Sequence, residues 1–139
     1  MTTLNNESNQ SFVTHTGSCH CKKVIFQVDA PKILEVQDCN CSICTKKGFL
    51  HLIVPNSRFR ILQGKDDLSV YTFNTHVAKH YFCNTCGVSP FYIPRSNPDG
   101  WDINFRCIDP DTVESFTVVK FDGQNWESNA ENLAHLSKS

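Results

Sequence analysis

The sequence predicts a mainly β protein built from short strands. Three observations support this: apolar side chains alternate along many short segments, those segments are rich in β-branched and aromatic residues, and Gly or Pro separates them. The first segment is Val24–Val28, where every second side chain is apolar and shares one face. The others are Leu50–Val54, Phe59–Leu62, Leu68–Phe73, Lys79–Phe82, Phe91–Ile93, Ile103–Phe105 and Phe116–Phe121.

One domain accounts for the length of 139 residues. Ten Phe and two Trp residues provide the core, and packing is the expected role of both Trp101 and Trp126. We expect residues 1–13 to form a disordered polar tail and residues 14–127 to form the domain. Residues 128–139 are expected to be a loose tail that can form a short helix around Leu133 and Leu136.

Charge and hydropathy argue against two classes of partner. Lys and Arg total 13 against 14 Asp and Glu, so the chain lacks the basic excess of a nucleic-acid-binding protein. It also lacks the run of roughly 18 apolar residues that would predict a membrane span. Residues 1–12 are polar and do not resemble a signal peptide. We therefore expect a cytoplasmic protein that binds neither membrane nor nucleic acid; the sequence indicates no protein partner.

Seven of the eight cysteines fall into three tight groups, which indicates metal binding rather than disulfide bonding. A disulfide needs a specific torsion between two residues, whereas zinc gathers several sulfurs about 2.3 Å from one centre. The first two groups to consider are Cys19/Cys21 and Cys83/Cys86. Two close pairs far apart in the chain can converge on one ion and complete a structural Cys₄ zinc site. The alternative is two unrelated pairs of buried cysteines.

The remaining group contains Cys39, Cys41 and Cys44, all within a predicted six-residue loop. Three protein ligands leave a zinc ion with an open position, which is typical of catalytic sites. Three thiolates also make the metal a weak Lewis acid, better suited to binding an incoming thiol than to activating water. A bound thiolate would add negative charge. The cations near the group in the sequence, and therefore candidate partners of that ligand, are Lys46, Lys47, Arg58 and Arg60.

The competing interpretation is a closed structural site whose fourth ligand comes from elsewhere in the chain. Cys107 is the first candidate by chemistry, followed by His51, His80 and His76. In that case both metals would stabilise the fold, and the protein would be a noncatalytic interaction module. No proton-transfer residue can be assigned from the sequence.

The order of these motifs resembles the glutathione-dependent formaldehyde-activating enzyme (Gfa) family, also called the centromere protein V family. The resemblance lies in Gly17-Ser18-Cys19-His20-Cys21, Asp38-Cys39-Asn40-Cys41-Ser42-Ile43-Cys44 and Phe82-Cys83-Asn84-Thr85-Cys86-Gly87. Further segments are similar to the centromere protein V branch in particular: Ile53–Pro55, Tyr71–His76, Phe91–Pro98 and Asp122–Glu127.

The resemblance implies an Mss4-like fold, a tent of short antiparallel sheets with two zinc sites. The structural zinc would be held by Cys19, Cys21, Cys83 and Cys86, and the second, open zinc by Cys39, Cys41 and Cys44. Family members are described as binding glutathione at the second zinc and condensing it with formaldehyde to S-hydroxymethylglutathione. The resemblance therefore implies a carbon–sulfur lyase whose partners are a small-molecule thiol and an aldehyde.

Overall fold

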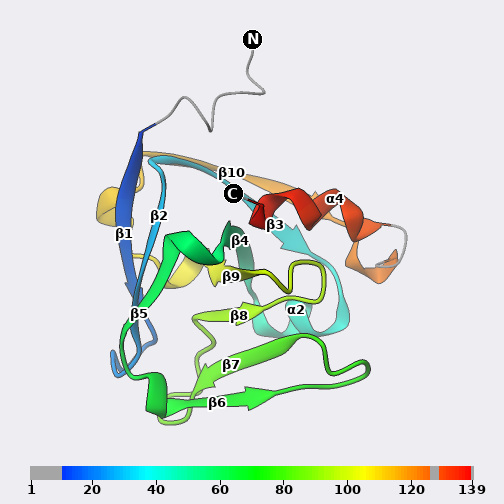
Figure 1. Cartoon of the computed structure of the whole chain (residues 1–139), viewed down its shortest axis with the longest axis horizontal. Helices are drawn as coiled ribbons and strands as arrows, with labels where there is room; N and C mark the ends of the chain where they lie inside the picture. Colours follow the sequence, from blue (N-terminus) through cyan, green and yellow to red (C-terminus); the bar gives the residue numbers. More distant parts are fainter. Residues whose placement is uncertain (1–10, 126–128, 139) are drawn as a thin grey trace.

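Two β-sheets form the framework of the computed structural model, which describes residues 11–125 and 129–138 (Figure 1). The smaller sheet contains β1 (Phe12–Ser18), β2 (Ile25–Pro31) and β5 (Phe59–Gln63), in that order. The larger sheet contains, from one edge to the other, β10 (Ser115–Phe121), β3 (Ile33–Cys39), β4 (Leu50–Pro55), β9 (Gly100–Asn104), β8 (Phe91–Ile93), β7 (Lys79–Cys83) and β6 (Leu68–Tyr71).

The mainly β prediction is confirmed, and each of the eight predicted segments overlaps a strand. Two strands were not predicted: β3, and β1, which begins at Phe12 inside the segment expected to be a disordered tail. Phe12 pairs with Pro31 at the start of an antiparallel ladder. The expectation of antiparallel sheets holds except at one edge, where β10 runs parallel to β3. The long connection after β9 makes this parallel pairing possible.

Helical segments connect and flank the strands. They are α2 (Ser42–Lys47), α4 (Glu131–Ala134) and the 3₁₀ turns η2 (Asn56–Arg58), η3 (Lys65–Asp67), η4 (Phe105–Cys107), η5 (Pro110–Thr112), η6 (Gly123–Asn125) and η7 (His135–Ser137). The short C-terminal helix was predicted. It is not loose, however, because the buried Asn97 side chain donates to Leu133 O, at 2.8 Å, and Ala134 O, at 3.2 Å.

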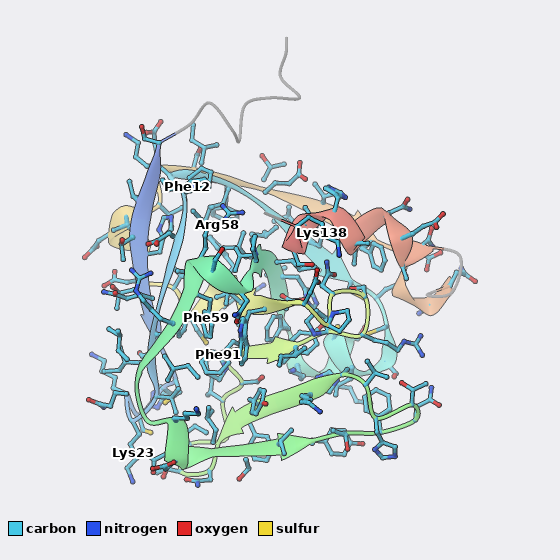
Figure 2. The ribbon with its side chains drawn as sticks, viewed as in Figure 1. Phe12, Lys23, Arg58, Phe59, Phe91 and Lys138 are labelled. Carbon is cyan, nitrogen blue, oxygen red and sulfur yellow. The ribbon has the colours of Figure 1, made fainter. Side chains whose placement is uncertain are left out.

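Aromatic packing between the sheets forms the core. Phe26 from β2 and Phe91 from β8 are fully buried, with ring centroids 5.7 Å apart. Phe59 lies 5.0 Å from Phe91 and 4.7 Å from Trp101, and Figure 2 shows Phe59 and Phe91 in this interior. The predicted packing role of Trp101 is therefore confirmed. Trp126 lies outside the described residues.

Strand β4 separates this core from a second buried region. All six of its residues are buried, because the strand lies inside the larger sheet and is covered on both faces. Leu50, Leu52 and Val54 join the hydrophobic core, whereas His51 and Ile53 face a cavity on the opposite side. The two-residue period of a strand thus places core side chains and cavity side chains on alternate positions. No helix among the described residues is long and apolar enough to cross a membrane.

Candidate functional site

Four cysteines predicted to form one site come together at one end of the smaller sheet. Cys19 and Cys21 lie in the turn after β1, and Cys83 and Cys86 lie at the end of β7 and in the turn that follows. Cys21 Sγ lies 3.7 Å from Cys19 Sγ and 3.6 Å from Cys83 Sγ. Sulfurs bound tetrahedrally about 2.3 Å from zinc would be about 3.8 Å apart, so the four thiols fit one ion.

Backbone groups around this cluster are arranged to support sulfur ligands. The amide of Val24 donates to Cys19 Sγ at 3.4 Å, and the amide of Thr85 donates to Cys83 Sγ at the same distance. Gly87 has a φ of 79° and closes the turn by donating its amide to Cys83 O at 2.8 Å. Amides directed at sulfur stabilise thiolates over thiols, which favours metal binding.

The second cluster contains Cys39, Cys41 and Cys44, whose sulfurs all lie within 4.8 Å of one another. The structure corrects the prediction that this segment is a loop. Cys39 ends β3, Cys41 is the N-cap of α2 and accepts from the amide of Cys44 at 3.4 Å, and Cys44 is buried in the first turn of the helix. A strand end and a helix cap therefore hold the three thiols on one short connection.

Segment η6 closes over this cluster. The side chain of Asn40 accepts from the amide of Gln124 at 2.9 Å and donates to Asp122 Oδ1 at 3.2 Å. Gly123 lies so close that a Cβ there would overlap Cys39 Sγ and lie 2.9 Å from Cys41 Cβ. The C-terminal part of the domain thus forms one wall of a site whose thiols come from its first third.

Hydrogen bonding within the trio distributes its charge unevenly. Hydrogen bonds from Cys39 and Cys44 lower the pKa of Cys41 to about 2, whereas the hydrogen bond with Cys41 raises the pKa of Cys39 to about 11. The pKa of Cys44 is raised as well, first by its hydrogen bond with Cys39. The hydrogen bonds within the trio thus favour the thiolate at Cys41 and the thiol at Cys39 and Cys44. The donor set thus fits a soft divalent cation, which would stabilise all three as thiolates.

The predicted candidates for a fourth ligand do not join this trio. Among the described residues, no further His, Cys, Asp or Glu atom lies within 4.8 Å of all three sulfurs. Cys107 instead lies near the first cluster, where burial and then the charges of Cys19 and Cys86 raise its pKa to about 12. His76 lies in the β6–β7 loop, with Nδ1 2.8 Å from Thr72 Oγ1. His51 and His80 line a cavity next to the trio.

The cavity has a volume of about 410 Å³. Three groups of residues line it: the trio with its helix, the polar face of the larger sheet, and the segments that cover that face. They are Gln37, Cys39, Cys41, Ser42, Ile43, Cys44, His51, Ile53, Phe73, Asn74, Thr75, Ala78, His80, Tyr92, Pro94, Arg95, Ser96, Asp102, Phe121, Gly123, Gln124 and Leu133. Its size is typical of a site for a small molecule.

Buried polar atoms of this cavity lack hydrogen-bond partners within the described part of the chain. They are Gln37 Oε1, His51 Nε2 and Asp102 Oδ1, and all three residues are less than a tenth exposed. The only other such atom among the described residues is Arg58 Nη1, which belongs to a residue outside the cavity lining. Because buried polar groups are normally satisfied, this concentration indicates a site that a polar ligand completes.

The four predicted cations separate into two groups. Lys47 lies 4.7 Å from the Phe49 ring centroid and 4.6 Å from that of Tyr92, and its Nζ donates to His80 Nδ1 at 3.4 Å. Burial lowers the pKa of Lys47, and the nearby Cys44 thiol, followed by Asp102, opposes that shift. Lys46, its neighbour in the last turn of α2, is exposed and does not line the cavity.

Arg58 and Arg60 do not lie at this cavity. Arg58 packs with its guanidinium carbon 4.4 Å from the ring centroid of Phe12. Both residues are labelled in Figure 2. Arg60 belongs to the smaller sheet, where Nη1 lies 3.0 Å from Asp29 Oδ2. The two arginines are near the trio in sequence only. After β4, which belongs to the larger sheet, the chain crosses to the smaller sheet, where β5 pairs with β2. Arg95, which lines the cavity, is a cation that the sequence analysis did not single out.

Comparison with known proteins identifies the family of the chain. Residues 14–121 match the sequence model of the family described as "Glutathione-dependent formaldehyde-activating enzyme". The chain belongs to this family.

Two relatives of the chain extend the comparison. A Halomonas elongata protein named "Putative glutathione-dependent formaldehyde-activating enzyme" is 30% identical over an alignment of 78 residues, and the match covers 50% of this chain and 50% of that protein. The chain thus spans about half the length of this curated relative. The crystal structure of a Rhodobacter sphaeroides protein, a structural-genomics target, superposes with a TM-score of 0.61 at 30% identity, covering 73% of this chain and 99% of that one. The mainly β fold with two cysteine clusters is thus a Gfa-type, Mss4-like arrangement, as expected.

Proposed function

We propose that this chain is a zinc-dependent enzyme of the carbon–sulfur lyase type. It would bind glutathione, or a related thiol, and promote the reversible condensation of that thiol with formaldehyde to S-hydroxymethylglutathione. The observation that carries the proposal is the shared cavity: the three thiols of the second cluster and three buried, unpartnered polar atoms line the same space. Membership in the Gfa family supports the choice of thiol and aldehyde.

Zinc is the metal we propose for both clusters. A Cys₄ shell of Cys19, Cys21, Cys83 and Cys86 would be structural, whereas Cys39, Cys41 and Cys44 would hold a second ion with one position open to the substrate. When bound there, zinc supplies a soft Lewis acid that lowers the pKa of an incoming thiol. The protein residues bind and orient the rest of the ligand. The carbonyl of Gln37 and the carboxylate of Asp102 can accept hydrogen bonds from its polar groups.

Cationic side chains at or next to the cavity can pair with the carboxylates of glutathione. Arg95 lines the cavity, and Lys47 contacts Tyr92 and His80, which also line it. Lys47 therefore remains in the proposal as a charge partner, joined by Arg95. Lys46 is removed from it, because its exposed side chain does not line the cavity. Arg58 and Arg60 are removed from it, since both lie away from the cavity lining.

Cobalt substitution tests the open position. Glutathione should change the thiolate-to-cobalt charge-transfer band of wild-type protein, and the protein should accelerate exchange between formaldehyde and S-hydroxymethylglutathione, measured by NMR. Lys47→Met should weaken the glutathione response, whereas Arg60→Met, matched in chemistry but placed on the other sheet, should leave it unchanged. Cys107→Ser should leave the second-site band unchanged as well, because Cys107 lies near the first cluster. A charge-transfer band that stays unchanged at saturating glutathione would contradict the proposal.

The second candidate function is a noncatalytic, zinc-stabilised interaction module. It is favoured by β10, an edge strand whose apolar residues Phe116, Val118 and Val119 are exposed. This function predicts that glutathione leaves the cobalt bands of both metal sites unchanged. It also predicts that substitutions on β10, such as Val118→Lys, abolish the biological role. The enzymatic proposal predicts that Val118→Lys leaves exchange activity intact.

Three finer statements belong to the same proposal. The chain would be closest to the centromere protein V branch, on the strength of its segments Ile53–Pro55, Tyr71–His76 and Phe91–Pro98. It would act in the cytoplasm, where glutathione is abundant and thiols stay reduced. It would carry two zinc ions per chain, which metal analysis of the purified protein measures directly.

A further inference from the structure

A buried histidine–aspartate pair stands in the cavity beside the second cluster. His51 Nδ1 lies 2.6 Å from Asp102 Oδ2, and the side chains are 5% and 1% exposed. In the β4–β9 ladder, His51 pairs with Asn104 and Ile53 pairs with Asp102, so His51 and Asp102 are diagonal neighbours on one face. Two central strands of the larger sheet therefore fix both side chains, and neither depends on a loop for its position.

The hydrogen bond selects the tautomer of His51. A carboxylate can only accept, so Nδ1 carries the proton that Asp102 binds, and the lone pair of a neutral ring lies on Nε2. Tyr92 Oη, at 3.5 Å, also approaches the Nδ1 side of the ring. Nε2 is buried and has no partner among the described residues, and His51 lines the cavity that the three thiols share. A proton acceptor is thus held ready for a ligand in that cavity.

The other histidine that lines the cavity, His80, already has a hydrogen-bond partner and a stacking partner. His80 stacks on Tyr92 with ring centroids 4.6 Å apart, and its Nδ1 accepts from the Lys47 ammonium. Burial, followed by the charge of Lys47, lowers the pKa of His80 to about 4, so it stays neutral at physiological pH. No carboxylate among residues 11–125 and 129–138 hydrogen-bonds to His80 in the way that Asp102 does to His51. His51 has one, which is the arrangement that a general base requires.

We propose that His51 is the proton-transfer residue of the reaction and that Asp102 is its positioning residue; this inference rests on the proposed function. His51 Nε2 takes the proton of the glutathione thiol. The sulfur electron pair forms the bond to the carbonyl carbon of formaldehyde, and the carbonyl π pair moves onto oxygen. The Nε2 proton then passes to that oxygen, giving the hydroxyl of S-hydroxymethylglutathione and restoring neutral His51. Every atom and electron of thiol and aldehyde is retained, and no co-reactant is needed.

A pair of variants tests this role. His51→Gln should reduce the protein-dependent exchange rate by about 100-fold or more, within the limit set by the uncatalysed background. It should leave two-metal content and the glutathione response of the cobalt band unchanged. His135→Gln, an exposed histidine on η7, should retain full activity. Asp102→Asn should lower the rate at every pH and alter its pH profile, because the ring loses its oriented partner. The other titratable or charged groups facing His51 are Tyr92, His80, Lys47, Arg95 and the three thiols.

A second readout is independent of activity. In zinc-loaded wild-type protein with ¹⁵N-labelled histidine, S-(2-hydroxyethyl)glutathione should shift the His51 Nε2 resonance. S-propylglutathione, of similar length but without the hydroxyl, should shift it much less. Equal shifts, or a His51→Gln protein with wild-type rate, would overturn the inference. The inference would also be overturned if the cobalt band of His51→Gln differed from that of wild-type protein before any thiol is added, because His51 would then be a metal ligand.

The two proposals can fail separately. If wild-type protein does not accelerate exchange, the proposed function fails, and the nitrogen shifts alone decide whether His51 receives a hydroxyl. If wild-type protein is active and His51→Gln is equally active, the proposed function stands and the role of His51 is wrong.

Discussion

Replacing Gly123 by alanine should damage the second metal site while sparing the first. Gly123 is buried in η6 against the trio, and its φ lies outside the left-handed range, so the new methyl group acts through space rather than through backbone strain. That methyl would overlap Cys39 Sγ and lie 2.9 Å from Cys41 Cβ. Non-bonded atoms prefer separations of about 3.5–4.0 Å, so Cys39 Sγ must move by roughly 1 Å.

A shift of that size exceeds what a metal site tolerates. Ligand distances are held to within about 0.2 Å, and even indirect disturbance of a ligand costs about 10–100-fold in affinity. Gly123→Ala should therefore weaken cobalt or zinc binding at the second site by at least that factor. Overpacking should lower the free energy of unfolding of the metal-free state by about 1–3 kcal/mol.

Competition with a chelator of known affinity measures both sites in one titration, and Cys41→Ser assigns the two phases. Gly48→Ala is the matched control. Gly48 caps α2 with a φ of 66°, and no atom lies within 4 Å of the position that a methyl group would take there. Alanine at this position should cost about 1–2 kcal/mol of stability without moving a sulfur. If Gly123→Ala binds both ions with wild-type affinity, or if Gly48→Ala weakens the second site equally, the reasoning from the overlap is wrong.

Three other predictions follow from the structure. Cys83→Ser should lower the midpoint of urea unfolding sharply, because metal binding at the Cys₄ cluster is coupled to folding; an unchanged midpoint would contradict a structural role. Arg60 lowers the pKa of the Asp29 carboxyl below 3.8, so this pair stabilises the fold above about pH 4 and loses its effect as the pH falls further. Both partners are partly exposed, and a double-mutant cycle should give less than about 1 kcal/mol, equal at pH 5 and pH 8. Asn97→Ala should speed amide hydrogen exchange in residues 129–138, because the C-terminal helix loses its buried donor; unchanged exchange would show that other contacts hold it.

The cysteine groups were predictable because short sequence spacing limits how far apart the sulfurs within each group can lie. Three thiols within six residues cannot be far apart, whatever strand or helix carries them. The prediction failed only on local conformation: Cys41 and Cys44 form the cap and first turn of α2, a helix too short to show an apolar period. Likewise β3 was missed because polar residues interrupt both of its faces: Glu35 and Gln37 lie on one face and Asp38 lies on the other.

The polar face of the cavity could not be found in the same way. His51 and Asp102 are separated by 51 positions. Taken alone, each segment indicates only a single polar residue inside an apolar strand. Their one sequence signal is an ionisable residue between apolar neighbours, in Leu50-His51-Leu52 and in Trp101-Asp102-Ile103. That signal marks a residue for attention but does not indicate its partner.

Residue types and their local spacing determined that this protein is mainly β and that its cysteines gather into a set of four and a set of three. Strand periodicity and the short spacing within each cysteine group act over a few residues, whereas the meeting of Cys19/Cys21 with Cys83/Cys86, 62 positions apart at Cys21 and Cys83, needed the tertiary fold. Tertiary structure alone decided that His51 meets Asp102, and that Arg60 binds Asp29 on the other sheet rather than facing the thiols. The register of β4 against β9 and the pairing of β5 with β2 set those contacts, and strand pairing is a long-range choice that no short segment encodes.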